Sequence, residues 1–442
     1  MEKHYKLEAP PAAFGSDMAK LVNDPLVTEA VAKAQERYLP WPEIKHKTWV
    51  PGNKESVWQL IKLVRQIDSE TTPIIDERQQ PYSFSPKLHA EFLHEVDLEL
   101  GGIFLGLQDF SESDRRQIIR RNLIEESIAS SQLEGANTSR AVAKKMLAAG
   151  REPRDKSERM IVNNHETMRW IEEELKNEKL SIDLLLELHR KVTQGTIDPT
   201  HQGALRDTLD ASGNRLVVKP WDDITIAYVA PSREFVEQEL PKFVAFANDE
   251  QKLRFIHPLT KAIMLHFWMG LLHPFEDGNG RLARILFYWY MLKRKYWAFS
   301  YLSISERILK SNKQYAMAYI YSQQDGFDLN YFIQYNVEKI KLARQAFREY
   351  LVAKTAESRQ ASNAIKKDFS LNDRQIKLLQ YLAKDELRYT TLKEHNNLND
   401  NIGKVTASAD LQKLVEKGFL RKEKRGRNVF YYPTSKIEQL FG

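Results

Sequence analysis

Apolar residues recur at three- and four-residue spacing across most of residues 91–335, which is the period of an amphipathic α-helix. The same spacing predicts a helix over residues 56–67, and a charged helix is expected over residues 337–367. The longest uncharged apolar stretch, residues 262–272, is too short to cross a bilayer and predicts a buried core helix. The pattern therefore favours a mainly α-helical protein.

One interruption of the helical pattern covers residues 216–228. This segment is short and rich in β-branched residues, and it is flanked by Gly213-Asn214 on one side and by Pro231 on the other. Strand-forming residues between turn residues are typical of a hairpin. We therefore expect a small β-hairpin flap within the helical protein.

The last part of the chain has a pattern of its own. Asn372 is expected to cap a helix reaching about residue 384, and two more helices are expected over residues 391–397 and 405–417. Residues 419–432 then predict two strands around a basic turn. Three helices followed by a basic hairpin resemble a winged helix-turn-helix domain.

Composition narrows the class of protein. A chain of 442 residues is long enough for two or three domains, and 42% hydrophobic with 29% charged residues is typical of a soluble protein. The absence of cysteine excludes disulfides, thiolate zinc sites and a cysteine nucleophile, and it suits a reducing compartment. The first residues, MEKHYKLEAPP, lack the apolar region of a signal peptide. A cytoplasmic, bacterial protein that does not enter a membrane is expected.

Residues 273–284 carry the densest chemistry, with the sequence His-Pro-Phe-Glu-Asp-Gly-Asn-Gly-Arg-Leu-Ala-Arg. Gly278 and Gly280 allow the backbone to turn its N–H groups inward at the start of a second helix, which makes a nest for an anion. Arg281 and Arg284 are three residues apart on that helix and can share a face. Two guanidinium groups beside such a nest suit a polyphosphate.

Two further side chains of this segment complete the chemistry. Asp277 supplies a hard oxygen ligand for Mg²⁺, which proteins commonly hold through one carboxylate together with substrate phosphates. His273 can accept a proton near neutral pH. Together these elements predict nucleotidyl or phosphoryl transfer.

Other interpretations of the same residues fit less well. Residues 278–283 match a loose dinucleotide-binding pattern, but that pattern must follow a short strand, and a long apolar helix is expected here. A calcium loop opening at Asp277 would need glutamate where Tyr288 stands. His266 lies seven residues before His273, which is not the usual zinc spacing, and is expected to be a core histidine. A purely structural loop remains an alternative.

Residues 273–284 also match every fixed position of the signature H-x-F-x-[DE]-G-N-G-R-x-x-R, so the chain resembles the Fic (filamentation induced by cAMP) family over roughly residues 115–335. The resemblance implies a Fic-type helical core and protein adenylyltransferase activity. Such an enzyme transfers AMP from Mg-ATP to a serine, threonine or tyrosine hydroxyl of a target protein or of itself, and releases pyrophosphate. ATP and Mg²⁺ are therefore the expected co-substrate and cofactor. Transfer of another nucleotide or phosphate group remains open.

The resemblance also assigns roles to single residues. His273 would take the proton of the attacking hydroxyl, Asp277 would hold Mg²⁺, and Arg284 would hold the γ-phosphate. The positions implied for the nucleotide site, with Phe275 as a packing anchor, are Phe275, Gly278, Asn279, Gly280, Arg281, Arg284 and Tyr315. In the family, an edge near the motif pairs with an extended target segment. The matching flap positions here are Thr225, Ile226, Ala227 and Tyr228.

A second family motif lies upstream. Residues 130–135 match the inhibitory pattern [ST]-x-x-x-E-[GN], with Ser130, Glu134 and Gly135 at its fixed positions, and they are expected to end a helix. A bidentate pair between Glu134 and Arg284 would occupy the guanidinium group meant for the γ-phosphate. The sequence thus predicts an autoinhibited enzyme, and removal of AMP assisted by Glu134 stays open.

The expected organisation is an N-terminal helical region (1–110), a Fic catalytic domain with its inhibitory helix (111–340), a helical linker (341–367) and a winged helix-turn-helix domain (368–442). That last fold commonly binds DNA, although protein docking is an alternative. Phosphate contacts are expected from Arg421, Lys422, Lys424, Arg425 and Arg427, and groove contacts from Thr406, Ser408 and Lys413. A DNA-binding regulator that uses the Fic fold as a nucleotide sensor is therefore the competing function, and a homodimer is one expected assembly.

Overall fold

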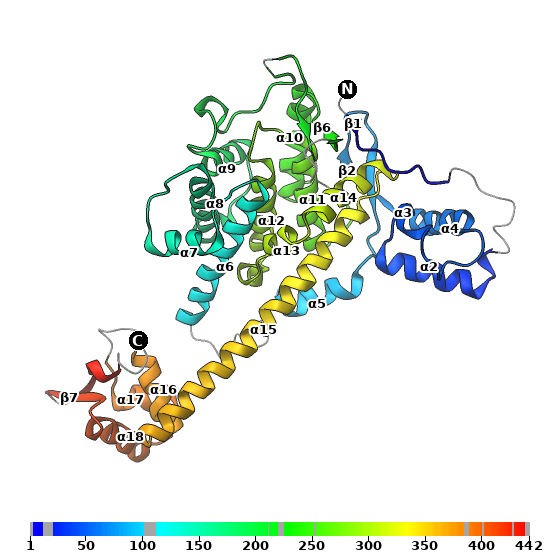
Figure 1. Cartoon of the computed structure of the whole chain (residues 1–442). Helices are drawn as coiled ribbons and strands as arrows, with labels where there is room; N and C mark the ends of the chain where they lie inside the picture. The colour runs from blue at the N-terminus through cyan, green and yellow to red at the C-terminus, as the bar shows by residue number, and fades with distance from the viewer. Residues whose placement is uncertain are drawn as a thin grey trace. The chain divides into compact units, whose positions relative to one another are not determined.

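The computed structural model describes residues 3–11, 21–100, 112–210, 212–219, 225–251, 253–383, 389–399, 402–426 and 428–437. The chain divides into two compact units. Unit 1 comprises Met1–Asp109 with Asp114–Phe347, and unit 2 comprises Phe110–Ser113 with Arg348–Gly442. The described residues are mainly helical, as the apolar pattern predicts (Figure 1).

Two helices form the centre of unit 1. α11 (Pro258–Leu272) and α12 (Asn279–Lys293) pack against each other, and nearly every side chain of both is buried. A helix that is apolar on all sides needs partners on all sides, and the predicted core helix over residues 262–272 is confirmed. α11 begins at Pro258, after His257, whose side chain accepts a hydrogen bond from the Leu259 N–H.

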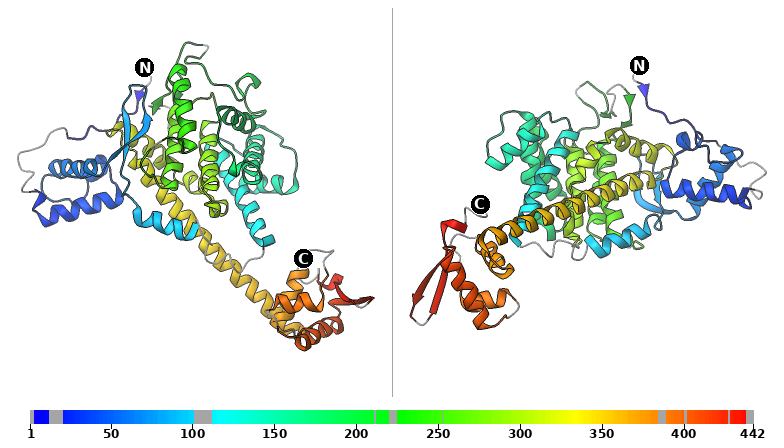
Figure 2. Two further views of the ribbon diagram at one scale, coloured as in Figure 1. Left: turned by 180° about the vertical axis from the view of Figure 1, so that it is seen from behind. Right: turned by 60° about the horizontal axis from the view of Figure 1, so that its bottom comes forward.

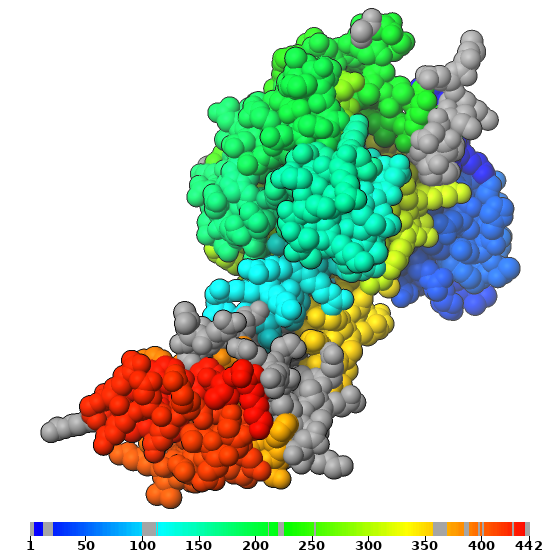
Figure 3. Space-filling model, turned by 60° about the vertical axis from the view of Figure 1, so that its left-hand side comes forward, coloured from blue at the N-terminus to red at the C-terminus, as the bar shows by residue number. Residues whose placement is uncertain are grey.

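The remaining helices of unit 1 surround this pair. α8 (Lys156–Glu173), α9 (Ile182–Thr193) and the short helices η1 (Leu175–Asn177) and η3 (Trp297–Tyr301) pack on α12, and α10 (Arg233–Ala247) packs on α11. α6 (Glu112–Leu133) and α7 (Arg140–Ala149) precede α8 along the chain. In the space-filling view the cyan to green segments that include α6 to α10 form a broad outer face of unit 1 (Figure 3).

After α12 the chain continues through α13 (Ser305–Leu309), α14 (Asn312–Gln324) and α15 (Asn330–Phe369). The expected charged helix over residues 337–367 is therefore the larger part of a helix that begins seven residues earlier, at Asn330. Both views of Figure 2 show α15 as one uninterrupted helix.

The first part of unit 1 is only partly as expected. The predicted helix over residues 56–67 is confirmed as α4 (Lys54–Ile67), which packs with α2 (Pro25–Arg37) and α3 (Trp41–Ile44), and α5 (Ala90–Leu100) lies further on. Between α4 and α5, the antiparallel strands β2 (Glu70–Ile75) and β3 (Pro81–Phe84) form a hairpin that the pattern did not predict. Prolines within and at the start of these strands hide the usual strand signal.

The predicted flap is confirmed as a small β-structure. β4 (Val217–Val218) pairs antiparallel with β6 (Tyr228–Val229). β5 (Thr225–Ile226) pairs in parallel with β1 (Lys3–His4), a strand from the beginning of the chain that the sequence did not predict. Figure 1 shows β1 beside β6 at the top of unit 1.

Unit 2 contains, after α15, the helices α16 (Asp373–Leu382), α17 (Leu392–Leu398) and α18 (Lys404–Glu416), followed by the antiparallel strands β7 (Leu420–Arg425) and β8 (Asn428–Pro433). The predicted cap by Asn372 is confirmed as a capping box, and Gly418 adopts a positive φ of 76° after α18. Leucines of the three helices pack with Phe419, Leu420 and Tyr431 in one core. This order of elements is the one that the winged-helix prediction requires.

Candidate functional site

Residues 273–278, which we call the motif loop, join the two central helices α11 and α12. α11 ends at His273 in a left-handed conformation (φ 44°, ψ 55°), where the His273 N–H donates to the Met269 carbonyl at 3.0 Å. α12 begins after Gly278, whose φ of 88° favours glycine because a side chain would be strained there. The loop thus brings a histidine from one buried helix to the N-terminus of another.

Internal hydrogen bonds hold this loop in shape. The Asn279 Oδ1 accepts from the Phe275 N–H at 3.0 Å, and the Asn279 Nδ2 donates to the Phe275 carbonyl at 2.7 Å. Phe275 itself is fully buried. Asn279 therefore braces the loop through both atoms of its side-chain amide.

His189, on α9, supports the loop from below, and sequence reasoning missed it. Its ring stacks on Phe275 with the ring centroids 3.7 Å apart. Its Nδ1 accepts from the Gly203 N–H at 3.0 Å, so its Nε2 carries the proton and donates to the Asp277 carbonyl at 2.7 Å. Burial lowers the pKa of His189 to about 4, which keeps this tautomer neutral. The available signal was a histidine on the buried face of an amphipathic helix.

His273 is arranged as a proton acceptor. Its Nδ1 lies 3.3 Å from the Gly270 carbonyl oxygen, which can only accept, so Nδ1 carries the proton and Nε2 the lone pair. Burial lowers the pKa of His273 to about 4. The ring is therefore neutral at neutral pH, and Nε2 is the atom that can take a proton.

Arg206 ties His273 to the flap and was also missed from the sequence. Its Nε donates to the His273 carbonyl at 2.7 Å, and its Nη2 donates to the Pro231 carbonyl at 2.7 Å. No motif contains this arginine, because its side chain donates only to main-chain carbonyls, which leave no residue signature. The proton acceptor and the base of the flap are thus joined by one side chain.

Asp277 faces outward from the loop, with its side chain 37% exposed. Its Oδ1 accepts from the Gly278 N–H and lies 3.4 Å from the Arg281 Nη2. Arg281 is fully buried and also donates to the Val192 carbonyl at 3.0 Å. Arg281 therefore orients Asp277 from beneath the loop, while Asp277 remains accessible to a cation.

Arg284 is held by the end of α6. Its Nε donates to the Ser130 Oγ at 2.9 Å, and its Nη2 donates to the Ser130 carbonyl at 2.8 Å and to the Glu134 Oε1 at 2.9 Å. The predicted partners are brought together. The contact with Glu134 uses one guanidinium nitrogen instead of the expected two, because Ser130 takes Nε.

Glu134 also covers the start of α12. A Cβ built on Gly280 would lie 2.2 Å from the Glu134 Oε1, so only glycine leaves room for this carboxylate. A helix N-terminus favours negative charge, and the carboxylate lies where the sequence predicts an anion nest. Gly135, just after α6, has the positive φ (88°) expected of a helix terminator.

Two buried N–H groups in this region have no hydrogen-bond partner among the described residues, namely Arg281 Nε and Arg284 Nη1. A buried donor without a partner is costly, by about 1–3 kcal/mol. Burial works to lower the pKa of Arg284, but Glu134 and Tyr315 outweigh it and leave that pKa raised. The guanidinium group therefore stays charged, and together these donors suit an anion that offers several oxygens.

Comparison with known proteins shows which family the site resembles. Residues 179–291 match the Fic/DOC family. The chain carries a Fic/DOC domain. It is similar to "Protein adenylyltransferase fic-1" of Caenorhabditis elegans (37% identity over 110 residues, 25% of this chain and 19% of that protein). It is also similar to "Protein adenylyltransferase Fic" of Nematostella vectensis (28% over 147 residues, 33% of this chain and 30% of that protein).

The chain thus spans about a fifth to a third of the length of these relatives. Among solved structures, it resembles Fic-1 (aa134 - 508) from C. elegans, with a TM-score of 0.51 and 20% identity over 77% of this chain and 92% of that chain. That likeness concerns the fold alone. It agrees with the predicted Fic-type helical core.

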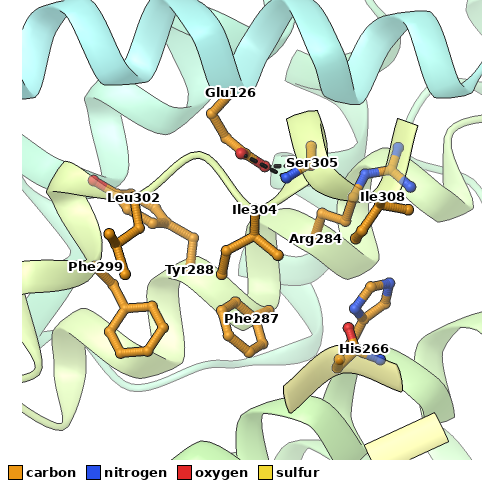
Figure 4. A pocket seen from close by; sticks show the side chains of 11 residues that line it. Glu126, His266, Arg284, Phe287, Tyr288, Phe299, Leu302, Ile304, Ser305 and Ile308 are labelled. Atoms are coloured by element: carbon orange, nitrogen blue, oxygen red, sulfur yellow. Dashed lines mark hydrogen bonds between the residues drawn. The ribbon is translucent and has the colours of Figure 1, made fainter. Parts of the chain in front are cut away.

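Tyr315, on α14, lies beside the arginine site of the Fic/DOC domain. Its hydroxyl lies 2.8 Å from the His266 Nε2, and burial raises its pKa. His266 is itself buried, as expected of a core histidine, with its pKa lowered to about 3. A small pocket is lined by Arg284, His266, Phe287, Ile304 and Ile308 among others (Figure 4). There Glu126 of α6 accepts from the Ser305 N–H at 2.9 Å.

The remaining predicted site residues lie on the flap and in unit 2. On the flap, the Tyr228 hydroxyl donates to the Leu271 carbonyl at 2.9 Å, two residues before His273. In unit 2 the basic residues Arg421, Lys422, Lys424 and Arg425 on β7 are exposed, as is Ser408 on α18. Arg427 lies outside the described residues. Thr406 and Lys413 are half-buried, and the Lys413 Nζ donates to the Ser370 carbonyl.

Among the described residues, no helix is both long and apolar enough to cross a membrane. Within the same part of the chain, no group of three or more acidic, histidine or cysteine side chains is placed to hold a metal ion.

Proposed function

We propose that this chain is a protein adenylyltransferase, which transfers AMP from Mg-ATP to a serine, threonine or tyrosine hydroxyl of a target protein or of itself. The observation that carries the proposal is the position of a neutral proton acceptor, His273, beside an anion site built from the start of α12 and Arg284. The similarity to proteins named protein adenylyltransferase supports the same reaction.

The proposed reaction uses the residues as follows. The His273 Nε2 takes the proton of the acceptor hydroxyl, whose oxygen forms a bond to the α-phosphorus of ATP as the bond to the β-phosphate oxygen breaks. Pyrophosphate leaves, and its charge is stabilised by Arg284 and by the N–H groups at the start of α12. General-base action of this kind typically contributes about 10²–10⁴-fold to the rate.

The residues present fit a magnesium ion. Among the described residues, both contacts of Asp277 use Oδ1, so Oδ2 is available to a cation. One carboxylate with phosphate oxygens and water is a common set of ligands for Mg²⁺, and the ion would neutralise charge on the phosphates. Arg281 would keep Asp277 oriented, and His189 would hold the main chain of the same residue.

We further propose that the enzyme is autoinhibited. Glu134 contacts Arg284 and lies against Gly280, so its carboxylate competes with a phosphate both for the guanidinium group and for the helix N-terminus. Charge-assisted hydrogen bonds are worth roughly 1.5–3 kcal/mol, which corresponds to suppression by about tenfold to a hundredfold. We also propose that the chain is a cytoplasmic, bacterial protein and that it forms a homodimer.

The test uses a Glu134→Gly chain with Mg²⁺ and α-labelled ATP, alone and with cell lysate. Label is expected on protein, more weakly with the unmutated chain, and not with a Glu134→Gly/His273→Ala double variant. Parallel reactions with labelled GTP and CTP identify the donor. Nucleotide binding without any transfer to protein would contradict the proposed reaction.

A second candidate function, DNA binding, rests on unit 2. Four basic side chains on β7 are exposed, and two of them, Arg421 and Arg425, lie over the ring of Tyr432 at 5.6 and 5.7 Å from its centroid. Exposed cations on a hairpin suit phosphate contacts. The chain would then be a regulator whose Fic/DOC domain senses nucleotide, and retarded migration of a DNA fragment would support it.

A further inference from the structure

The edge of the flap strand is already paired with another strand of the chain. β1 lies along β5 in parallel register, with Lys3 opposite Thr225 and His4 opposite Ile226, and the Tyr5 N–H donates to the Ile226 carbonyl at 2.8 Å. Successive residues of a strand direct their main-chain groups to opposite sides.

The other side of the same strand is occupied as well. The Ala227 N–H donates to the Val218 carbonyl at 2.9 Å, and Val218 pairs with Tyr228. At residues 225–227, one side of the flap strand therefore pairs with β4 and the other with residues 3–5. An additional strand has no edge to pair with here unless one of these two leaves.

Residues 3–8, which we call the leading segment, have further anchors. The Gln324 side chain behaves like a peptide group of a neighbouring strand, because its Nε2 donates to the Tyr5 carbonyl at 2.9 Å and its Oε1 accepts from the Leu7 N–H at 2.9 Å. Glu8 forms an ion pair with Lys45. All of these contacts lie within unit 1.

The occupied edge is connected to the proton acceptor. The Tyr228 hydroxyl bonds the Leu271 carbonyl, and Arg206 bridges the Pro231 and His273 carbonyls. A peptide paired with the flap strand would therefore be held by the same elements that fix His273. We infer that the leading segment occupies the docking edge for an extended peptide of the target, and that the target must displace it.

This inference rests on the proposed adenylyl transfer. It adds, to the autoinhibition by Glu134, a separate control over the binding of the target protein. Because the leading segment is tethered, its effective concentration at the edge is on the order of millimolar. A target peptide of equal intrinsic affinity would compete poorly until the segment is released. The anchors contact neither Glu134 nor Arg284, so this control leaves the phosphate site unchanged.

The first test measures hydrogen exchange at residues 225–228, which needs no catalysis. Removing residues 2–8 should accelerate exchange there by at least about tenfold, and Gln324→Ala should do so to a smaller extent in the whole chain. A synthetic peptide of residues 2–11, added in millimolar excess to the shortened chain, should restore slow exchange. The same peptide with Tyr5→Pro, which lacks the N–H that bonds Ile226, should not. Tyr5→Phe in the whole chain is the control, since it keeps the main-chain pairing.

Unchanged exchange in both variants, or equal protection by the proline peptide, would overturn the inference. The second test adds label transfer to lysate proteins in the Glu134→Gly background, where removal of residues 2–8 should raise transfer by about tenfold at unchanged ATP affinity. Equal transfer would exclude competition with targets. Absence of label in both chains would mean that the proposed function fails, and the exchange data would still decide whether the edge takes an extended peptide.

Discussion

The Oε1 of Glu134 lies 2.9 Å from the Nη2 of Arg284, across the N-terminus of α12. The arginine side chain is 4% exposed and that of the glutamate 23%, so the pair is poorly screened by solvent. Because Ser130 accepts hydrogen bonds from the Nε and the Nη2 of Arg284, we expect this arginine to keep its position when the glutamate is removed.

We expect Glu134→Gly to bind a non-hydrolysable ATP analogue about tenfold to a hundredfold more tightly than the unmutated chain, by calorimetry with Mg²⁺ present. Glu134→Gln is the matched control, since it keeps the shape of the side chain but removes the charge, and it should lie between the two. Equal affinities in all three chains would show that the ion pair does not oppose nucleotide binding.

The pH dependence follows from the buried, neutral ring of His273. A general base works in its unprotonated form, so kcat/KM should rise with pH through the pKa of about 4 and be level near neutrality. Glu134 is among the groups that raise this pKa, so Glu134→Gly should move the acid limb to still lower pH. An acid limb near 6.5, the ordinary value for histidine, would contradict this description. Melting temperatures over the same pH range separate it from unfolding.

The sequence revealed the part of the site that is contiguous. His273, Asp277 and Arg284 fall within twelve residues, and Glu134 could be paired with Arg284 through a second short motif. His189 and Arg206 were missed, because they come from 88 and 67 residues before their partners and bond carbonyl oxygens. Bonds to main-chain atoms do not constrain which residue stands at the other end, so neither motif nor spacing records them.

The same limit applies to the fold. The helical period identified α11, α12 and the helices of unit 2, because the spacing of apolar residues reflects which faces of a helix are buried. The pairing of β1 with β5 joins two-residue strands from distant parts of the chain. Such short strands carry no period, and their stability depends on tertiary contacts that a local pattern cannot show.

His189 offers a test of loop support. Replacing it with phenylalanine keeps a stacked ring but leaves the Asp277 carbonyl and the Gly203 N–H without their buried partner, at a cost of about 1–3 kcal/mol in unfolding free energy. We expect a lower kcat with little change in KM for ATP. His189→Gln, which can restore the donor, should recover part of both the stability and the rate. If kcat is unchanged in a destabilised His189→Phe chain, the residue supports the fold alone.

The last prediction concerns the β7–β8 hairpin of unit 2. If β7 contacts phosphates, the Lys422→Ala/Lys424→Ala chain should bind a non-specific DNA duplex of about 20 base pairs more weakly. The slope of log K against log salt should also fall by about 0.9 for each phosphate that the protein no longer neutralises. Lys436→Ala is the matched control, because Lys436 lies over Phe369 and Phe419 and bonds the Lys417 carbonyl, away from the hairpin. An equal reduction in the control would indicate that the overall positive charge, and not the β7–β8 hairpin, attracts the DNA. If the unmutated chain does not bind DNA, the DNA-binding function is contradicted.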